Sequence, residues 1–181
     1  MEKRTKKKEQ DGQQESLEHQ SLEVSMLNKD SFSDEELESY LSKGAIRASD
    51  EITVPPKILF VGDCTIATFG NFSASTGKAK SKKTFNISAM VAAAVTNSTV
   101  LNYRACLPEG KRTILYFDTE QSKYHCHTVL ERIYRLSGLS LKKDDPRLMF
   151  WGLREYTPKL RIAVIDYALR KYEGVGLVII D

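Results

Sequence analysis

The stretch "TGKAKSKKTFNIS", residues 76–88, joins a region of short apolar runs to an alanine-rich segment with helical periodicity. Aligned with the pattern G-x-x-x-x-G-K-[ST], it puts Gly77 at the first glycine, Lys83 at the phosphate-contacting lysine and Thr84 at the magnesium-binding hydroxyl. Lys82 stands where the second glycine belongs. The stretch therefore predicts a phosphate-binding loop that departs from the pattern at one position. The alternative is a solvated basic turn at the start of a helix.

The departure at Lys82 concerns the backbone of the loop. Glycines allow such a loop to curl so that its N–H groups point at phosphate. Because a residue with a Cβ is strained at positive φ, we expect either another loop conformation or some strain at Lys82. The lysine charges would attract the same phosphates. The predicted nucleotide-binding set is Gly77, Lys78, Ala79, Lys80, Ser81, Lys82, Lys83 and Thr84.

The segments on both sides of the loop supply its context. "KILFV" (57–61) and "ATFGNFSAST" (67–76) are predicted strands, and the second runs directly into the loop. The segment after the loop has apolar residues at i, i+3, i+4, i+7 and i+8, which predict a helix with one buried face. These residues are Ile87, Met90, Val91, Ala94 and Val95.

The rest of the sequence alternates between strand and helix patterns. Strands are predicted in 112–118, 147–151 and 177–181, with a helical pattern around residues 126–133 between the first two. Thr157-Pro158 supplies a cap and a first-turn proline for a third helix. This alternation predicts an α/β fold built from βαβ units, with a mostly parallel sheet flanked by helices.

The N-terminal part has a different composition. Residues 1–50 carry 8 Lys or Arg against 12 Asp or Glu, whereas residues 51–181 carry 19 against 12. Residues 1–50 are predicted to be a disordered polar tail with a short acidic helix near 33–43. Ser33 and Glu36 have capping-box spacing, and Gly44 can end that helix. Residues 51–181 are predicted to be the folded domain, and their positive charge favours partners that carry phosphate.

Cysteine usage and hydropathy indicate the compartment. Cys64, Cys106 and Cys126 form no paired framework, and no apolar stretch approaches the length of a membrane span. We therefore expect a cytoplasmic protein with no membrane association. "HCH" at 125–127 has no second ligand pair, so a zinc site is not expected.

Three segments in this order, "GKAKSKKT", "ILYFDTEQS" and "GLVIID", resemble a RecA-like P-loop ATPase core over roughly residues 52–181. The likeness is closest to the RepA-type hexameric helicases and AAA family ATPases of plasmids and mobile elements. It implies binding of ATP and Mg²⁺, catalytic roles for Lys83 and Glu120, and metal binding by Thr84 and Asp181. It also implies a helicase- or motor-like ATPase that acts on DNA and assembles as a homo-oligomeric ring. Because such cores continue with further strands, we expect the sequence to be the N-terminal part of the domain, ending at the Walker B aspartate.

The two acidic residues can also be argued from position alone. Glu120 follows an apolar strand, and Asp181 ends one, so both are expected at the carboxyl edge of a parallel sheet, where ligands bind. A group that orients the attacking water must reach that edge. The alternatives are an acid at a helix N-terminus, a role that Asp118 could equally fill, and a turn residue at a strand end.

Two other functions remain open at this point. The first is a deviant-Walker ATPase switch of the partition type, which has an extra lysine just after the first glycine, where Lys78 stands. The second is a degenerate nucleotide- or DNA-binding module without hydrolysis, which the lysine at position 82 would permit.

Overall fold

The computed structural model describes residues 32–78 and 82–181. These residues belong to two units, which divide between Ile52 and Thr53. Within the described part of the first unit, α2 (Asp34–Gly44) corresponds to the helix expected near 33–43. The side chains of Ser33 and Glu36 form the expected capping box, and no residue of the helix is buried. The prediction of a disordered tail before Phe32 lies outside the described residues.

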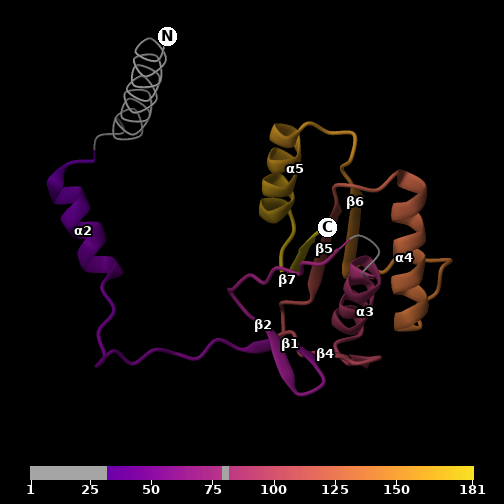
Figure 1. Ribbon diagram of the computed structural model, residues 1–181, viewed down its shortest axis with the longest axis horizontal. Helices are drawn as coiled ribbons and strands as arrows, with labels where there is room; N and C mark the ends of the chain where they lie inside the picture. Colours follow the sequence, from indigo (N-terminus) through magenta and orange to yellow (C-terminus); the bar gives the residue numbers. More distant parts are fainter. Residues whose placement is uncertain (1–31, 79–81) are drawn as a thin grey trace, which may run out of the picture. The chain divides into compact units, whose positions relative to one another are not determined.

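The second unit contains two sheets (Figure 1). The first is antiparallel, with strand order β2-β1-β4-β3. Its strands are β1 (Lys57–Val61), β2 (Cys64–Thr68), β3 (Thr99–Val100) and β4 (Tyr103–Ala105). The predicted strand at 57–61 is confirmed. Four of the seven described strands lie in this antiparallel sheet, which is separate from the predicted parallel one and was not expected from the sequence.

The predicted strand at 67–76 is wrong beyond Thr68. The chain turns back after β1 and forms the antiparallel strand β2, which ends at that residue. Val61 pairs with Cys64 across a two-residue turn that begins at Gly62, where φ is 54°. A glycine at positive φ suits the tight turns that join hairpin strands. The ladder ends where Phe69 N–H donates to Pro56 C=O, and Gly70 at φ 82° turns the chain away. The described residues that approach the lysine-rich loop therefore contain no strand.

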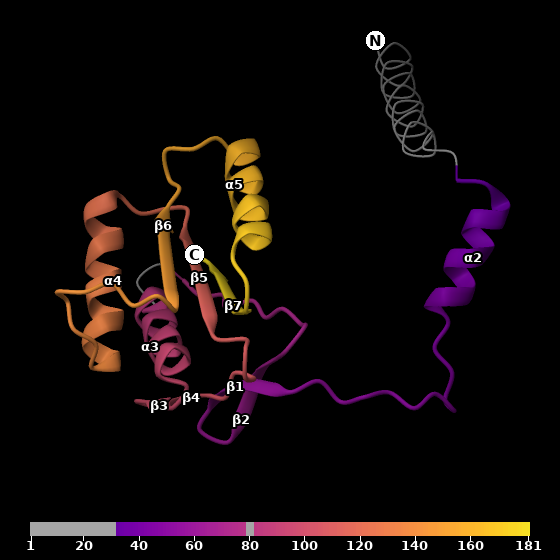
Figure 2. The ribbon, with the colours of Figure 1, turned by 180° about the vertical axis from the view of Figure 1, so that it is seen from behind.

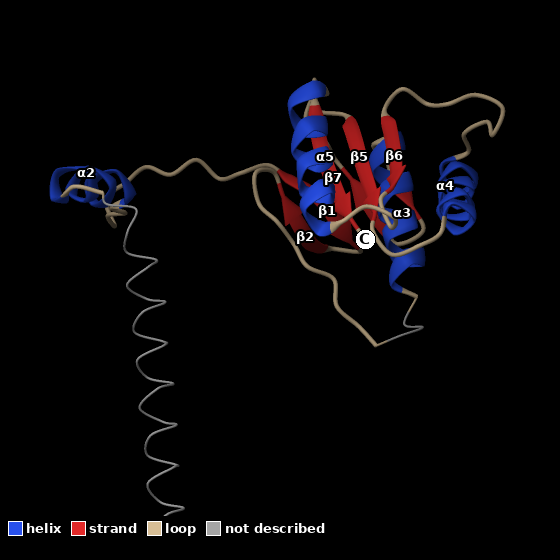
Figure 3. Cartoon of the chain, turned by 90° about the horizontal axis from the view of Figure 1, so that it is seen from above, coloured by secondary structure: helices blue, strands red, loops and turns tan. Residues whose placement is uncertain are grey.

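The second sheet is parallel, with strand order β6-β5-β7. Its strands are β5 (Thr113–Asp118), β6 (Leu148–Gly152) and β7 (Val175–Ile180). These strands alternate with α4 (Lys123–Ser137) and α5 (Pro158–Lys171), and α3 (Lys83–Thr96) precedes them. The chain is thus an α/β protein with a three-stranded parallel sheet flanked by helices, as Figures 2 and 3 show.

The helices cover the two faces of this sheet differently. On central strand β5, Ile114 and Tyr116 belong to the cluster that contains α3 and α4, whereas Leu115 and Phe117 pack with α5. Both faces of β5 are buried, which explains its uninterrupted apolar sequence. Along β7 the same alternation puts Leu177 and Ile179 on the α3 face. The next residue of that parity is Asp181.

The helix α3 connects the two sheets. Ala92, Ala93 and Ala94 are buried in one cluster with Ile58 and Leu59 of β1, Ala105 of β4 and Ile114 of β5. Small side chains allow the helix to approach both sheets closely. The helix is consequently buried on a wider face than the periodicity of its larger residues indicated.

Candidate nucleotide site

The N-terminus of α3 lies at the carboxyl edge of the parallel sheet, where β5 and β7 also end (Figures 1 and 2). Lys82 is the N-cap residue, followed by Lys83 and Thr84 in the first turn. The side chain of Lys82 makes no capping hydrogen bond, and the first turn contains no acidic residue. The free N–H groups and the positive end of the helix dipole at this turn favour an anion.

The backbone of Lys82 adopts the left-handed conformation, with φ 61° and ψ 24°. Of the two outcomes expected from the sequence, the structure shows strain rather than an ordinary conformation. Lys82 thus has the positive φ that a glycine would favour at this position, at a cost of about 1–2 kcal/mol. Its carbonyl accepts the first helical hydrogen bond from Asn86 N at 3.0 Å, and its side chain is exposed.

The remaining residues of the predicted loop are only partly described. Gly77 and Lys78 lie in exposed coil, and Lys83 is exposed at the start of α3. Thr84 is half-buried, and its carbonyl oxygen accepts a 2.6 Å hydrogen bond from Ser88 Oγ. The predictions for Ala79, Lys80 and Ser81 lie outside the described residues.

A further positive charge lies beside the first turns of α3. The guanidinium of Arg132 on α4 is 6.0 Å from the ring centroid of Phe85 and donates to Ser88 Oγ at 3.5 Å. Sequence reasoning missed this residue, because its proximity depends on the packing of α4 against α3. Its charge adds to the attraction of this helix end for anions.

Asp118 and Glu120 have different surroundings at the end of β5. The fully buried carboxylate of Asp118 accepts hydrogen bonds from Glu120 N at 3.1 Å, Gln121 N at 2.7 Å and Gln121 Nε2 at 2.9 Å. Asp118 therefore stabilises the turn before α4, the role that was the alternative for Glu120. Glu120 is exposed on that turn, at the carboxyl edge of the sheet.

Asp181, the residue after β7, is hydrogen-bonded to three residues of the β5 segment. Its N–H donates to Phe117 O at 3.0 Å, and its carbonyl accepts from Thr119 N at 2.7 Å and Thr119 Oγ1 at 3.0 Å. Its carboxylate oxygen Oδ2 accepts a 2.9 Å hydrogen bond from the hydroxyl of Tyr116. The backbone and the side chain of Asp181 are thus both fixed by the β5 segment.

Tyr116 was not among the residues singled out from the sequence. Its side chain is fully buried and stacks on Phe150, with ring centroids 4.3 Å apart. Burial raises the pKa of the Tyr116 hydroxyl, and the neighbouring Asp181 carboxylate raises it further. The sequence did contain one indication of this contact, a tyrosine inside a strand expected to be buried. A buried hydroxyl requires a hydrogen-bond partner.

The "HCH" segment lies on the first turns of α4. Cys126 is buried, and its thiol contacts Gln121 O at 3.6 Å, whereas His125 and His127 are exposed. Burial, and then the charge of Asp118, raise the pKa of the Cys126 thiol to about 11. Among the described residues, no three His, Cys, Asp or Glu side chains gather as a metal-binding group. A magnesium ion at this edge would need phosphate and water ligands in addition to Asp181 and Thr84, a common arrangement for Mg²⁺.

No family model matches this chain. The curated proteins and the solved structures likewise contain no match. No helix in the described part of the chain is long and apolar enough to span a membrane.

Proposed function

We propose that the chain is the nucleotide-binding part of a Mg²⁺-dependent ATPase of the RecA-like P-loop class. The proposal rests on one observation: the N-terminus of α3 and Asp181 lie at the same edge of the parallel sheet. The K-K-T start of α3 lies at the carboxyl edge of the parallel sheet, and Asp181 directly follows β7 with the parity of the residues that face α3. A phosphate-binding helix end and a strand-end carboxylate on the same side of a sheet are the elements that hold Mg·ATP.

Each residue has a distinct role in this proposal. Lys83 contacts the β- and γ-phosphates, while the hydroxyl of Thr84 and the carboxylate of Asp181 bind Mg²⁺ directly or through water. The N–H groups of the first turn of α3 bind phosphate oxygens. Glu120 orients the attacking water, since it is exposed on the turn that follows β5.

Binding of Mg·ATP by titration calorimetry tests the nucleotide site. We expect Lys83→Ala to weaken binding at least tenfold, because an ammonium group on phosphate is lost. Lys159→Ala is the matched control, since Lys159 is an exposed lysine in the first turn of another helix, α5. Equal affinities for the wild type and Lys83→Ala would contradict the proposal.

Steady-state hydrolysis tests the role of Glu120. Glu120→Gln is expected to retain ATP binding and to lower turnover by two orders of magnitude or more, because the carboxylate that orients water is lost. Glu155→Gln is its control, because Glu155 is another exposed acid that follows a parallel strand of this sheet. Unchanged turnover in Glu120→Gln would remove Glu120 from the mechanism.

The wider function follows from the resemblance of the three sequence motifs. In this proposal the ATPase is cytoplasmic, forms a ring of identical subunits and acts on DNA as a helicase or motor in replication or mobilisation of a genetic element. Sedimentation with and without Mg·ATP tests ring assembly. Titration of single-stranded DNA at two salt concentrations tests DNA binding, because phosphate contacts weaken as salt rises.

A further inference from the structure

The ends of β5 and β7 carry two aspartates with different hydrogen-bond environments. Tyr116 pairs with Ile179 in the parallel register, so the residues at 116, 118, 179 and 181 share the face covered by α3 and α4. The carboxylate of Asp118 accepts hydrogen bonds from two backbone N–H groups and one side-chain amide. The hydroxyl of Tyr116 donates instead to Oδ2 of Asp181.

Tyr116 is a rigid donor. Its ring is completely buried, lies 4.3 Å from the ring of Phe150 and is inclined to it by only 14°. A phenol hydroxyl has one proton to donate, and in the described structure this proton goes to Asp181. The fixed ring therefore determines where Oδ2 lies, and Oδ1 of the same carboxylate accepts no hydrogen bond from the described residues.

The hydroxyl has no packing role that phenylalanine could not fill. Its neighbour Phe117 and its stacking partner Phe150 show that plain aromatic rings fit on both faces of this sheet. A buried hydroxyl is unfavourable unless it is hydrogen-bonded, so its place here depends on the carboxylate that it contacts.

We propose that Tyr116 is a positioning residue for the metal site, which holds Asp181 through Oδ2 so that Oδ1 is oriented toward Mg²⁺ or a water molecule bound to it. This inference rests on the proposed ATPase function, because it assigns Asp181 to the magnesium of Mg·ATP. It adds a residue that contacts neither nucleotide nor metal and acts through the orientation of one carboxylate.

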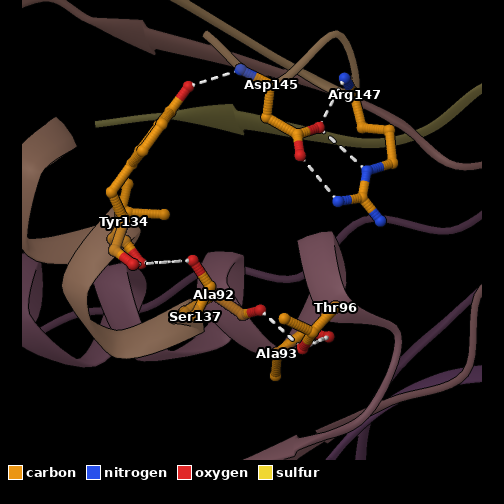
Figure 4. A network of polar contacts seen from close by, with 8 residues as sticks. Ala92, Ala93, Thr96, Tyr134, Ser137, Asp145 and Arg147 are labelled. Atoms are coloured by element: carbon orange, nitrogen blue, oxygen red, sulfur yellow. Dashed lines mark hydrogen bonds and ion pairs between the residues drawn. The ribbon is translucent and has the colours of Figure 1, made fainter. Parts of the chain in front are cut away.

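The test compares Tyr116→Phe with Tyr134→Phe. Both substitutions remove only a buried phenol hydroxyl, and the Tyr134 hydroxyl accepts a 2.7 Å hydrogen bond from Asp145 N in a separate network with Arg147 (Figure 4). ATP affinity is measured by calorimetry with excess Mg²⁺ and again with EDTA. The ratio of the two affinities reports the contribution of the metal.

We expect Tyr116→Phe to lower this ratio about fivefold, the factor that corresponds to loss of one hydrogen bond. Its affinity for metal-free ATP should equal that of the wild type, and Tyr134→Phe should match the wild type in both conditions. Combining Tyr116→Phe with Asp181→Asn should lower the ratio no further than Asp181→Asn alone, because Tyr116 acts through that carboxylate.

Three results would overturn the inference, and they can be told apart. A wild-type ratio in Tyr116→Phe would remove Tyr116 from the metal site while leaving the ATPase proposal intact. An equal loss of affinity with and without Mg²⁺ would mean that the variant only loosens the fold. Failure of the wild-type chain to bind Mg·ATP would refute the proposed function and this inference with it.

Discussion

Replacing Lys82 with glycine should stabilise the folded unit that contains α3. The backbone at Lys82 has φ 61°, a conformation that costs a residue with a Cβ about 1–2 kcal/mol. Glycine removes this cost but adds about 0.5–1 kcal/mol of backbone entropy to the unfolded chain. Because the Lys82 side chain is exposed, no packing is lost. The expected net gain in the free energy of unfolding is about 0.5–1 kcal/mol.

Urea unfolding followed by circular dichroism measures this gain. With an m-value of about 2 kcal/mol/M, the midpoint should rise by about 0.3–0.5 M. Lys82→Ala separates the backbone from the charge, because alanine loses the ammonium group but keeps the Cβ and therefore the strain. We expect Lys82→Ala to raise the midpoint less than Lys82→Gly does, because it removes only the unfavourable charge at the positive end of the helix dipole.

A second residue provides the matched positive control. Leu101 also has positive φ, 52°, in the turn between β3 and β4, and its side chain is 58% exposed. Leu101→Gly should raise the midpoint by a similar amount without altering ATP affinity, because this turn lies at the far end of α3. If Lys82→Gly and Lys82→Ala unfold at the same urea concentration, the reasoning from backbone strain is refuted.

Three further predictions concern the packing around the parallel sheet. Gly176→Ala should lower the free energy of unfolding by about 3 kcal/mol, because its Cβ would overlap the carbonyl oxygen of Lys111. A Cβ at Gly44 would meet nothing within 4 Å, so Gly44→Ala should change the free energy of unfolding little. Urea unfolding of both variants checks this prediction. Asp118→Asn should cost about 2–3 kcal/mol in the same assay, because an amide cannot accept all the hydrogen bonds that the buried carboxylate receives. Burial raises the pKa of Cys126 from 9.0 to about 11, so its thiol should resist Ellman's reagent in the folded chain while the two exposed thiols react. Between these pH values the unfolded chain binds fewer protons than the folded one, so stability should fall by up to about 1.4 kcal/mol per pH unit, and Cys126→Ala should lessen this fall.

The sequence was sufficient where a local pattern determines the element. Thr157 and Pro158 begin α5 as expected, with the Thr157 hydroxyl accepting from Leu160 N at 3.4 Å. The apolar strands around Ile114 and Leu177 are also confirmed as strands. The run in β5 is explained by burial on both faces, whereas β7 is the last strand in the order β6-β5-β7 and its residues are only partly buried or exposed. The prediction of a strand at 67–76 was wrong because the turn at Gly62 begins a hairpin. The second strand of that hairpin ends at Thr68, before most of the predicted range.

The candidate site was less accessible to sequence reasoning than the fold. The motif assigns Lys83 and Thr84 to the start of a helix, and the structure agrees with that placement. The contacts of Arg132 with α3 and of Tyr116 with Asp181 join residues 44 and 65 positions apart. Such contacts depend on the packing of one helix on another and on the register between two parallel strands, which no local pattern specifies.

The two aspartates at the sheet edge show why position alone does not assign a role. Asp118 ends β5 and Asp181 directly follows β7, so both lie on the same face at the expected ligand-binding edge of the sheet. Asp118 is completely buried and receives three hydrogen bonds from its own turn, so a metal ion would have to displace them. Asp181 is partly exposed, and from the described part of the chain its carboxylate receives a hydrogen bond only from the Tyr116 hydroxyl, on Oδ2. The number of donors around each carboxylate therefore separates the aspartate that stabilises a turn from the one that we propose as a magnesium ligand.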